Sequence, residues 1–134
     1  MDIFKNSVIN DLSYALKVNS IKNDVISNNI ANVDTPGYKA KKLEFKEVME
    51  EYFSQGKKLP LKRTDSRHFP GSPNIFNPSS FIREQNNPSL RNDGNDVNLD
   101  YEMSEMAKNG IQYSMYAQII AGKFTGLKSA IAGR

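Results

Sequence analysis

A heptad repeat of apolar residues near the C-terminal end constrains the fold of this chain most strongly. Its ten positions are separated alternately by four and three residues: Leu99, Met103, Met106, Gly110, Tyr113, Ala117, Ile120, Phe124, Leu127 and Ile131. This period is typical of a helix that packs lengthwise against other helices. Asn98 is a suitable N-cap, and acidic residues follow it at the positive end of the helix dipole. We therefore expect one long helix over 98–134.

Two small residues lie on this seam. Gly110 and Ala117 shorten the side chains there, which allows a neighbouring helix backbone to approach closely. The alternative is that both residues are merely tolerated on an otherwise apolar face.

A second apolar stripe runs through the N-terminal part of the chain. Its members recur about every 3.6 residues: Phe4, Val8, Leu12, Ala15, Val18, Ile21, Ile26, Ile30 and Val33. This spacing predicts an amphipathic helix over 1–35, which Thr35-Pro36-Gly37 ends because proline disfavours a helical residue before it and Pro-Gly suits a type II turn. Since the two long helices lie at opposite ends of the chain, they are expected to form an antiparallel, coiled-coil-like pair.

The segment between them, 36–97, is expected to form an irregular arm. A short helix is predicted over about 41–54, where Phe45, Val48 and Met49 share one side. Residues 60–97 are rich in proline and asparagine, which favours an extended path, and Phe81-Ile82 suits a strand or part of a short β-hairpin. The predicted fold class is therefore mainly α, an antiparallel pair of long terminal helices with an extended middle arm.

The composition argues against an enzyme. The chain has 134 residues, no Cys and one His, so it offers no disulfide framework, thiolate nucleophile or Cys-based metal site. Asp65, Ser66 and His68 carry the side chains of a nucleophilic triad, but no buried scaffold or oxyanion hole accompanies them, which favours a polar turn. DGNDVNLD, residues 93–100, lacks the ligand spacing of a calcium loop. We predict no catalytic activity, cofactor or metal site.

The charge distribution leaves two interpretations of the middle arm. The net charge is only +3, but residues 39–67 contain nine Lys or Arg and five acids, with aromatic residues among them. Alternating charges of this kind usually form a solvated helix face. The alternative is a cytosolic coiled-coil binding module whose basic middle segment binds nucleic acid or another anionic partner.

An isolated two-helix hairpin lacks a third element to cover its apolar stripes. We therefore expect neighbouring subunits to complete the packing through these residues: Val8, Leu12, Val18, Ile21, Ile26, Ile30, Met103, Met106, Gly110, Tyr113, Ala117, Ile120, Phe124, Leu127 and Ile131. No signal peptide or long apolar span is visible, so we expect the chain either to stay in the cytosol or to leave it without a cleaved leader.

The N-terminal helix ends in a segment that resembles the signature of bacterial flagellar rod and hook axial proteins. The segment is SNNIANVDTPGYK, residues 27–39, and the motif positions are Ser27, Asn28, Asn29, Ala31, Asn32, Thr35, Pro36, Gly37 and Tyr38. The resemblance continues at 64–68, 93–103 and 122–131, where it points to the proximal-rod members. The short middle arm agrees, because hook and distal-rod members carry large inserted domains.

This resemblance implies a structural subunit of the flagellar basal-body rod. Such subunits assemble through their terminal helices into a helical tube that transmits torque from the inner-membrane ring towards the hook, within the periplasmic space. The implied partners are other copies, other rod proteins, the inner-membrane (MS) ring protein with its adaptor protein FliE, and the type III export apparatus, which passes the chain unfolded. Nucleic acid and direct membrane insertion are not implied.

Two further roles follow from the resemblance. Phe45 and Met49 resemble the FxxxΦ element by which early rod and hook substrates engage the export gate, although an amphipathic helix produces this spacing by chance. Asn28, Asn29 and Asn32 have amides that either make hydrogen bonds between subunits or solvate the helix end.

Overall fold

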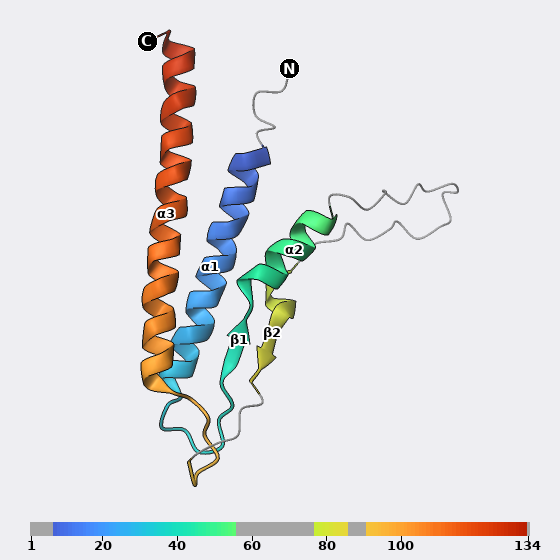
Figure 1. The fold of residues 1–134 in the computed structure, drawn as a ribbon, viewed down its shortest axis with the longest axis vertical. Coiled ribbons are helices and arrows are strands. Elements are labelled where there is room, and N and C mark those ends of the chain that lie inside the picture. The colour runs from blue at the N-terminus through green and yellow to red at the C-terminus, as the bar shows by residue number, and fades with distance from the viewer. Residues whose placement is uncertain (1–6, 56–76, 86–90, 134) are drawn as a thin grey trace, which may run out of the picture.

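The fold is a pair of long antiparallel helices with a small α/β layer on one side (Figure 1). The computed structural model describes residues 7–55, 77–85 and 91–133. Its elements are α1 (Ser7–Ala31), β1 (Lys41–Leu43), α2 (Phe45–Gln55), the 3₁₀ helix η1 (Pro78–Phe81), β2 (Ile82–Glu84) and α3 (Leu99–Ala132). The prediction of paired terminal helices and a largely irregular middle is confirmed.

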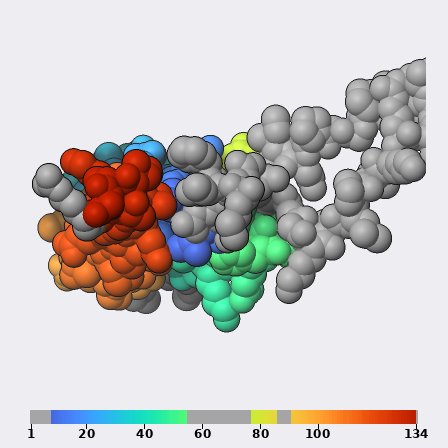
Figure 2. Space-filling view, turned by 90° about the horizontal axis from the view of Figure 1, so that it is seen from above, coloured from blue at the N-terminus to red at the C-terminus, as the bar shows by residue number. Residues whose placement is uncertain are grey.

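α1 is the central element of the molecule. α3 packs along one side of it, while β1, α2 and η1 contact it from the other side (Figure 1). The core between α1 and this second layer consists of Val18, Leu43 and Val48, each at most 1% exposed. Seen from above, α3 forms one edge of the molecule and α2 lies towards the opposite edge (Figure 2). α3 therefore has α1 as its main neighbour.

The helix predicted over 41–54 begins only at Phe45, because the three residues Lys41–Leu43 form a strand instead. β1 pairs antiparallel with β2, with Leu43 opposite Ile82. The side chain of Asn29 also holds this strand, since its Nδ2 donates to the Lys41 carbonyl at 2.7 Å and its Oδ1 accepts from the Lys41 N–H at 2.9 Å. These partners are distant in sequence, so helical periodicity alone misses the strand.

The helix boundaries follow local signals. Asn98 caps α3, because its Oδ1 accepts a hydrogen bond from the Tyr101 N–H at 3.1 Å, as predicted. α1 ends before Pro36, and the next residue, Gly37, has a φ of 71°. The Tyr38 N–H donates to the Thr35 carbonyl at 3.3 Å, which closes the predicted type II turn. In the described part of the chain, neither long helix is apolar enough to cross a membrane.

Candidate assembly surface

The buried part of α3 is polar. Its two buried residues are Glu102 and Asn109, and neither belongs to the heptad seam. Asn109 Nδ2 donates to the carbonyl of Asn19 on α1 at 2.9 Å, and Lys22 forms an ion pair with Glu105 at 3.0 Å. The contact between the long helices is therefore built around polar side chains, beside the predicted seam.

The seam itself is largely open in the single chain. Its partly buried members are Met106, Ala117, Ile120 and Leu127, and its exposed members are Leu99, Met103, Gly110, Tyr113, Phe124 and Ile131. Met103 is 56% exposed, Phe124 54% and Ile131 82%. At Gly110, apart from its chain neighbours and the nearby backbone of α3 itself, no atom of the described residues lies within 4 Å of the position a Cβ would take. The seam thus has room for another helix.

The corresponding stripe of α1 is mostly used inside the chain. Val18 and Ile26 are buried, while Leu12, Ile21 and Ile30 are partly buried. Only Val8, at 43%, is substantially exposed among the α1 residues predicted to pack. α1 therefore organises the single chain, and α3 carries most of its free apolar surface.

α3 has a second apolar stripe that the heptad analysis missed. Ile111, Met115 and Ile119 are 72%, 48% and 41% exposed. Their spacing of four residues places them on one face, roughly 160° around the helix from the seam. This spacing was a readable signal in the sequence, but the stronger heptad pattern obscured it. α3 consequently presents apolar residues on two nearly opposite faces.

The family motif forms a joint between the helices. The Nδ2 of Asn95, a buried residue before α3, donates to the carbonyls of Asn32, Val33 and Thr35 at 2.9, 3.0 and 2.8 Å. These carbonyls lie just after the end of α1, where helical partners run out. The Gly37 N–H also donates to the Asp93 carbonyl at 2.8 Å. The joint therefore fixes the end of α1 beside the start of α3.

The amides of the motif act within the chain. Asn29 is fully buried, and its Oδ1 accepts from the Tyr38 hydroxyl at 3.3 Å in addition to its two bonds to β1. Asn32 donates to the Asn28 carbonyl at 2.7 Å and accepts from the Thr35 hydroxyl at 3.2 Å. Asn29 therefore has no exposed surface in the single chain, and a contact of these amides between subunits stays a prediction. Asn28 is exposed.

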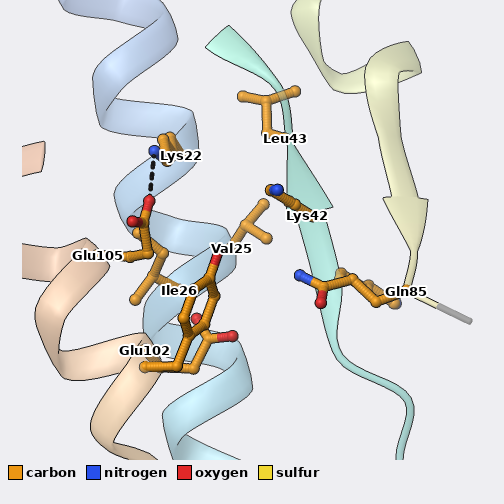
Figure 3. A pocket seen from close by; sticks show the side chains of 10 residues that line it. Lys22, Val25, Ile26, Lys42, Leu43, Gln85, Glu102 and Glu105 are labelled. Carbon is orange, nitrogen blue, oxygen red and sulfur yellow. Dashed lines mark hydrogen bonds and ion pairs between the residues drawn. The ribbon is translucent and has the colours of Figure 1, made fainter. Parts of the chain in front are cut away.

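A small pocket separates α1, α3 and the sheet (Figure 3). Its volume of about 10 Å³ is that of a single water site. Glu102 lies in this pocket, and burial raises the pKa of its carboxyl, although a hydrogen bond from Asn29 and the nearby Lys22 and Lys42 oppose this shift. Hydrogen bonds from Lys108 and Lys22 lower the pKa of Glu105 instead. Two carboxyls one turn apart thus have opposite shifts.

The remaining predicted sites fall into three groups. Residues 64–68 lie outside the described residues. Among those described, no group of three or more His, Cys, Asp or Glu is arranged to hold a metal ion. In the described part of the basic segment, Lys42 of β1 pairs with Glu44. Lys46 pairs with Glu50 one turn further along α2, as on a solvated helix face.

Phe45 and Met49, the residues that resemble an export element, are partly buried at the start of α2. Both pack against the core of Val18, Leu43 and Val48. The Phe45 ring also stacks on Tyr116 of α3, with the ring centroids 6.1 Å apart. The folded chain therefore holds these two side chains in its own packing.

A long helix pair with exposed apolar faces and a hydrogen-bonded joint at one end is typical of a structural subunit of a larger assembly. Sequence comparison gives the family. Residues 11–39 match the family model described as "Flagella basal body rod protein". The flagellar basal body rod protein FlgB of Bacillus subtilis is 38% identical over 133 residues, which cover 99% of this chain and 98% of the relative.

Other relatives agree over most of their length. FlgB of Yersinia enterocolitica is 32% identical over 125 residues, 87% of this chain and 88% of the relative. FlgB of Escherichia coli is 30% identical over 123 residues, 87% of each chain. The chain belongs to the FlgB family of flagellar basal body rod proteins, and it is a non-enzymatic structural subunit of the rod.

Proposed function

We propose that the chain joins the rod by packing the exposed faces of α3 against helices of neighbouring subunits, and that the resulting tube transmits torque from the inner-membrane ring towards the hook. The observation that carries this proposal is the exposure of Met103, Phe124 and Ile131 along a helix of 34 residues. Burying one such side chain is worth about 1.5 to 3 kcal/mol. A series of them along one helix favours a continuous lengthwise contact.

The mechanical role is supported by how the subunit is braced. The joint around Asn95 ties α1 to α3 with three hydrogen bonds from a single side chain. The salt bridge between Lys22 and Glu105 adds a cross-link further along, with both side chains less than one fifth exposed. A subunit tied at several levels transfers force along both helices rather than bending at the turn.

The specific binding partners also belong to this proposal. Besides copies of itself and other rod proteins, the chain meets the MS ring protein and its adaptor FliE at the inner-membrane end of the rod. It reaches the periplasmic space through the flagellar type III export apparatus. The modest core of the single chain supports passage in an unfolded state, since few buried apolar residues oppose unfolding.

The test compares the variants Phe124→Asp and Thr125→Asp in a motile bacterium whose rod contains this chain. Both residues are exposed on α3, but Phe124 is on the seam and the Thr125 hydroxyl donates only to its own helix, to the Ala121 carbonyl. We expect Phe124→Asp to be exported normally, to be lost from purified basal bodies and to abolish swimming. Thr125→Asp should be incorporated. Normal incorporation of Phe124→Asp contradicts the proposal.

A further inference from the structure

The groove between α1 and α3 contains buried amide groups that lack partners. Asn19 is fully buried and Asn109 is 2% exposed. Both amide atoms of Asn19 and the Oδ1 of Asn109 have no hydrogen-bond partner among the described residues. Leaving such groups unsatisfied costs about 1 to 3 kcal/mol each. The single chain therefore carries an unmet demand for one hydrogen-bond acceptor and two donors.

These amides line a hollow on the seam side of the molecule. Its volume is about 420 Å³, and its other walls are Ser20, Asn23, Gly110, Tyr113 and Ser114. Gly110 and Tyr113 are seam residues, so a helix that packs on the seam passes over this hollow. The missing side chain at Gly110 keeps the hollow open. A side chain from that helix thus lies over the two residues that carry the buried amides.

We infer that the hollow receives a carboxamide side chain from the α3 helix of a second copy of this chain; this rests on the proposed function. A carboxamide both donates and accepts hydrogen bonds, so one such group accepts from Asn19 Nδ2 and donates to the Asn19 and Asn109 oxygens. The rest of the contact is apolar: the seam of one copy packs against the Ile111, Met115 and Ile119 stripe of the second copy.

The second copy offers this group on the face opposite its own seam. The exposed stripe of Ile111, Met115 and Ile119 is flanked by the exposed residues Gln112 and Gln118. Packing that stripe onto the seam of the next copy covers both apolar faces of α3 in turn. A contact between two different faces can be repeated from copy to copy, and it gives a helical assembly unless it closes into a ring. A contact between two seams would cover only one of the two apolar faces of α3.

The first measurement separates a structural role of Asn19 from a docking role. In urea denaturation of the full chain, Asn19→Leu should be at least as stable as the wild type, because the substitution removes buried unsatisfied groups at similar volume. The matched control is Asn10→Leu, on an exposed position of the same helix. A clear loss of stability in Asn19→Leu assigns the residue to the fold of the single chain and overturns the inference.

The second measurement counts the chain in purified basal bodies, relative to another rod component. We expect Asn19→Leu to lower incorporation at least about tenfold, the equivalent of one lost buried hydrogen bond, while Asn10→Leu has no effect. Gln112→Leu or Gln118→Leu should cause a similar loss, and adding Asn19→Leu to it should cost nothing more.

Three results in this measurement overturn the inference. Normal incorporation of Asn19→Leu means that the hollow holds water only. Normal incorporation of both glutamine variants, or fully additive losses, means that another protein or another side chain occupies it. Failure of the wild-type chain to enter basal bodies at all contradicts the proposed function itself, which the variants do not test.

Discussion

Asn95 is the residue on which the joint between the two long helices depends most. Its buried amide donates to three carbonyls beyond the end of α1, and its Oδ1 accepts from the Val97 N–H at 2.8 Å. Residues 93–103 resemble the flagellar axial proteins, but no hydrophobic periodicity could assign this role to Asn95. A polar residue in a turn looks exposed until the chain folds back onto it.

Replacing Asn95 with Ala should lower the free energy of unfolding by about 2 to 3 kcal/mol, because the hydrogen bonds that this buried side chain makes are lost. Urea denaturation followed by circular dichroism measures this change. Asn92→Ala, at an exposed position of the same loop, is the control and should be neutral. Equal midpoints for the two variants would show that the joint does not depend on Asn95.

Glu102 and Glu105 should give the pH dependence of stability opposite signs. The pKa of Glu102 is raised in the folded chain, so its ionisation costs stability as the pH rises through that value. The pKa of Glu105 is lowered, so its ion pairs add stability that is lost as the pH falls.

Glu102→Gln should therefore be more stable than the wild type at about pH 7, with the difference vanishing below about pH 4. Glu105→Gln should be less stable at neutral pH, and this difference should also vanish in acid. Denaturation midpoints measured across this pH range check both expectations. A destabilised Glu102→Gln at neutral pH would contradict the assignment of burial as the main cause.

At the scale of elements, periodicity predicts the long helices well and their contacts poorly. The heptad of α3 and the turn after α1 are local signals, and both are confirmed. The side of α3 that faces α1 is set instead by the buried residue Glu102 and by Glu105 and Asn109, which have polar partners on α1. The strand at Lys41–Leu43 depends on Asn29 and β2, which lie too far away in the sequence for a local pattern to reveal them.

The start of α2 gives a test of the export proposal at this scale. Phe45 packs against the core of the folded chain, so the export proposal requires the gate to bind it before the chain folds. Phe45→Ala should reduce the amount of chain exported. The substitution also destabilises the fold, but a less stable chain is no harder to export, so the reduction would report the loss of contact with the gate. Lys46→Ala, on the exposed side of α2, is the control.

Immunoblotting of the exported fraction in cells that lack a hook measures this effect. Wild-type export of Phe45→Ala would show that the FxxxΦ spacing reflects only the amphipathic helix. Equal losses in both variants would point to a general effect of α2 on export.

At the scale of the whole molecule, the chain is asymmetric. α3 has 34 residues, while α1 as described has 25. The last turns of α3 extend beyond the N-terminal end of α1 (Figure 1). From Gly122 to the end of the helix, only Leu127 is partly buried. Isolated helical segments are marginal in water, so this part of α3 depends on neighbours for its order.

Amide hydrogen exchange of residues 121–132, compared between the free chain and purified rods, tests this dependence most directly. We expect these amides to exchange in the free chain nearly as fast as in an isolated helical peptide, and to become strongly protected in the rod. Residues 12–26 of α1 should be protected in both states and serve as the internal reference. Strong protection of residues 121–132 in the free chain would contradict the central claim that neighbouring subunits complete this helix.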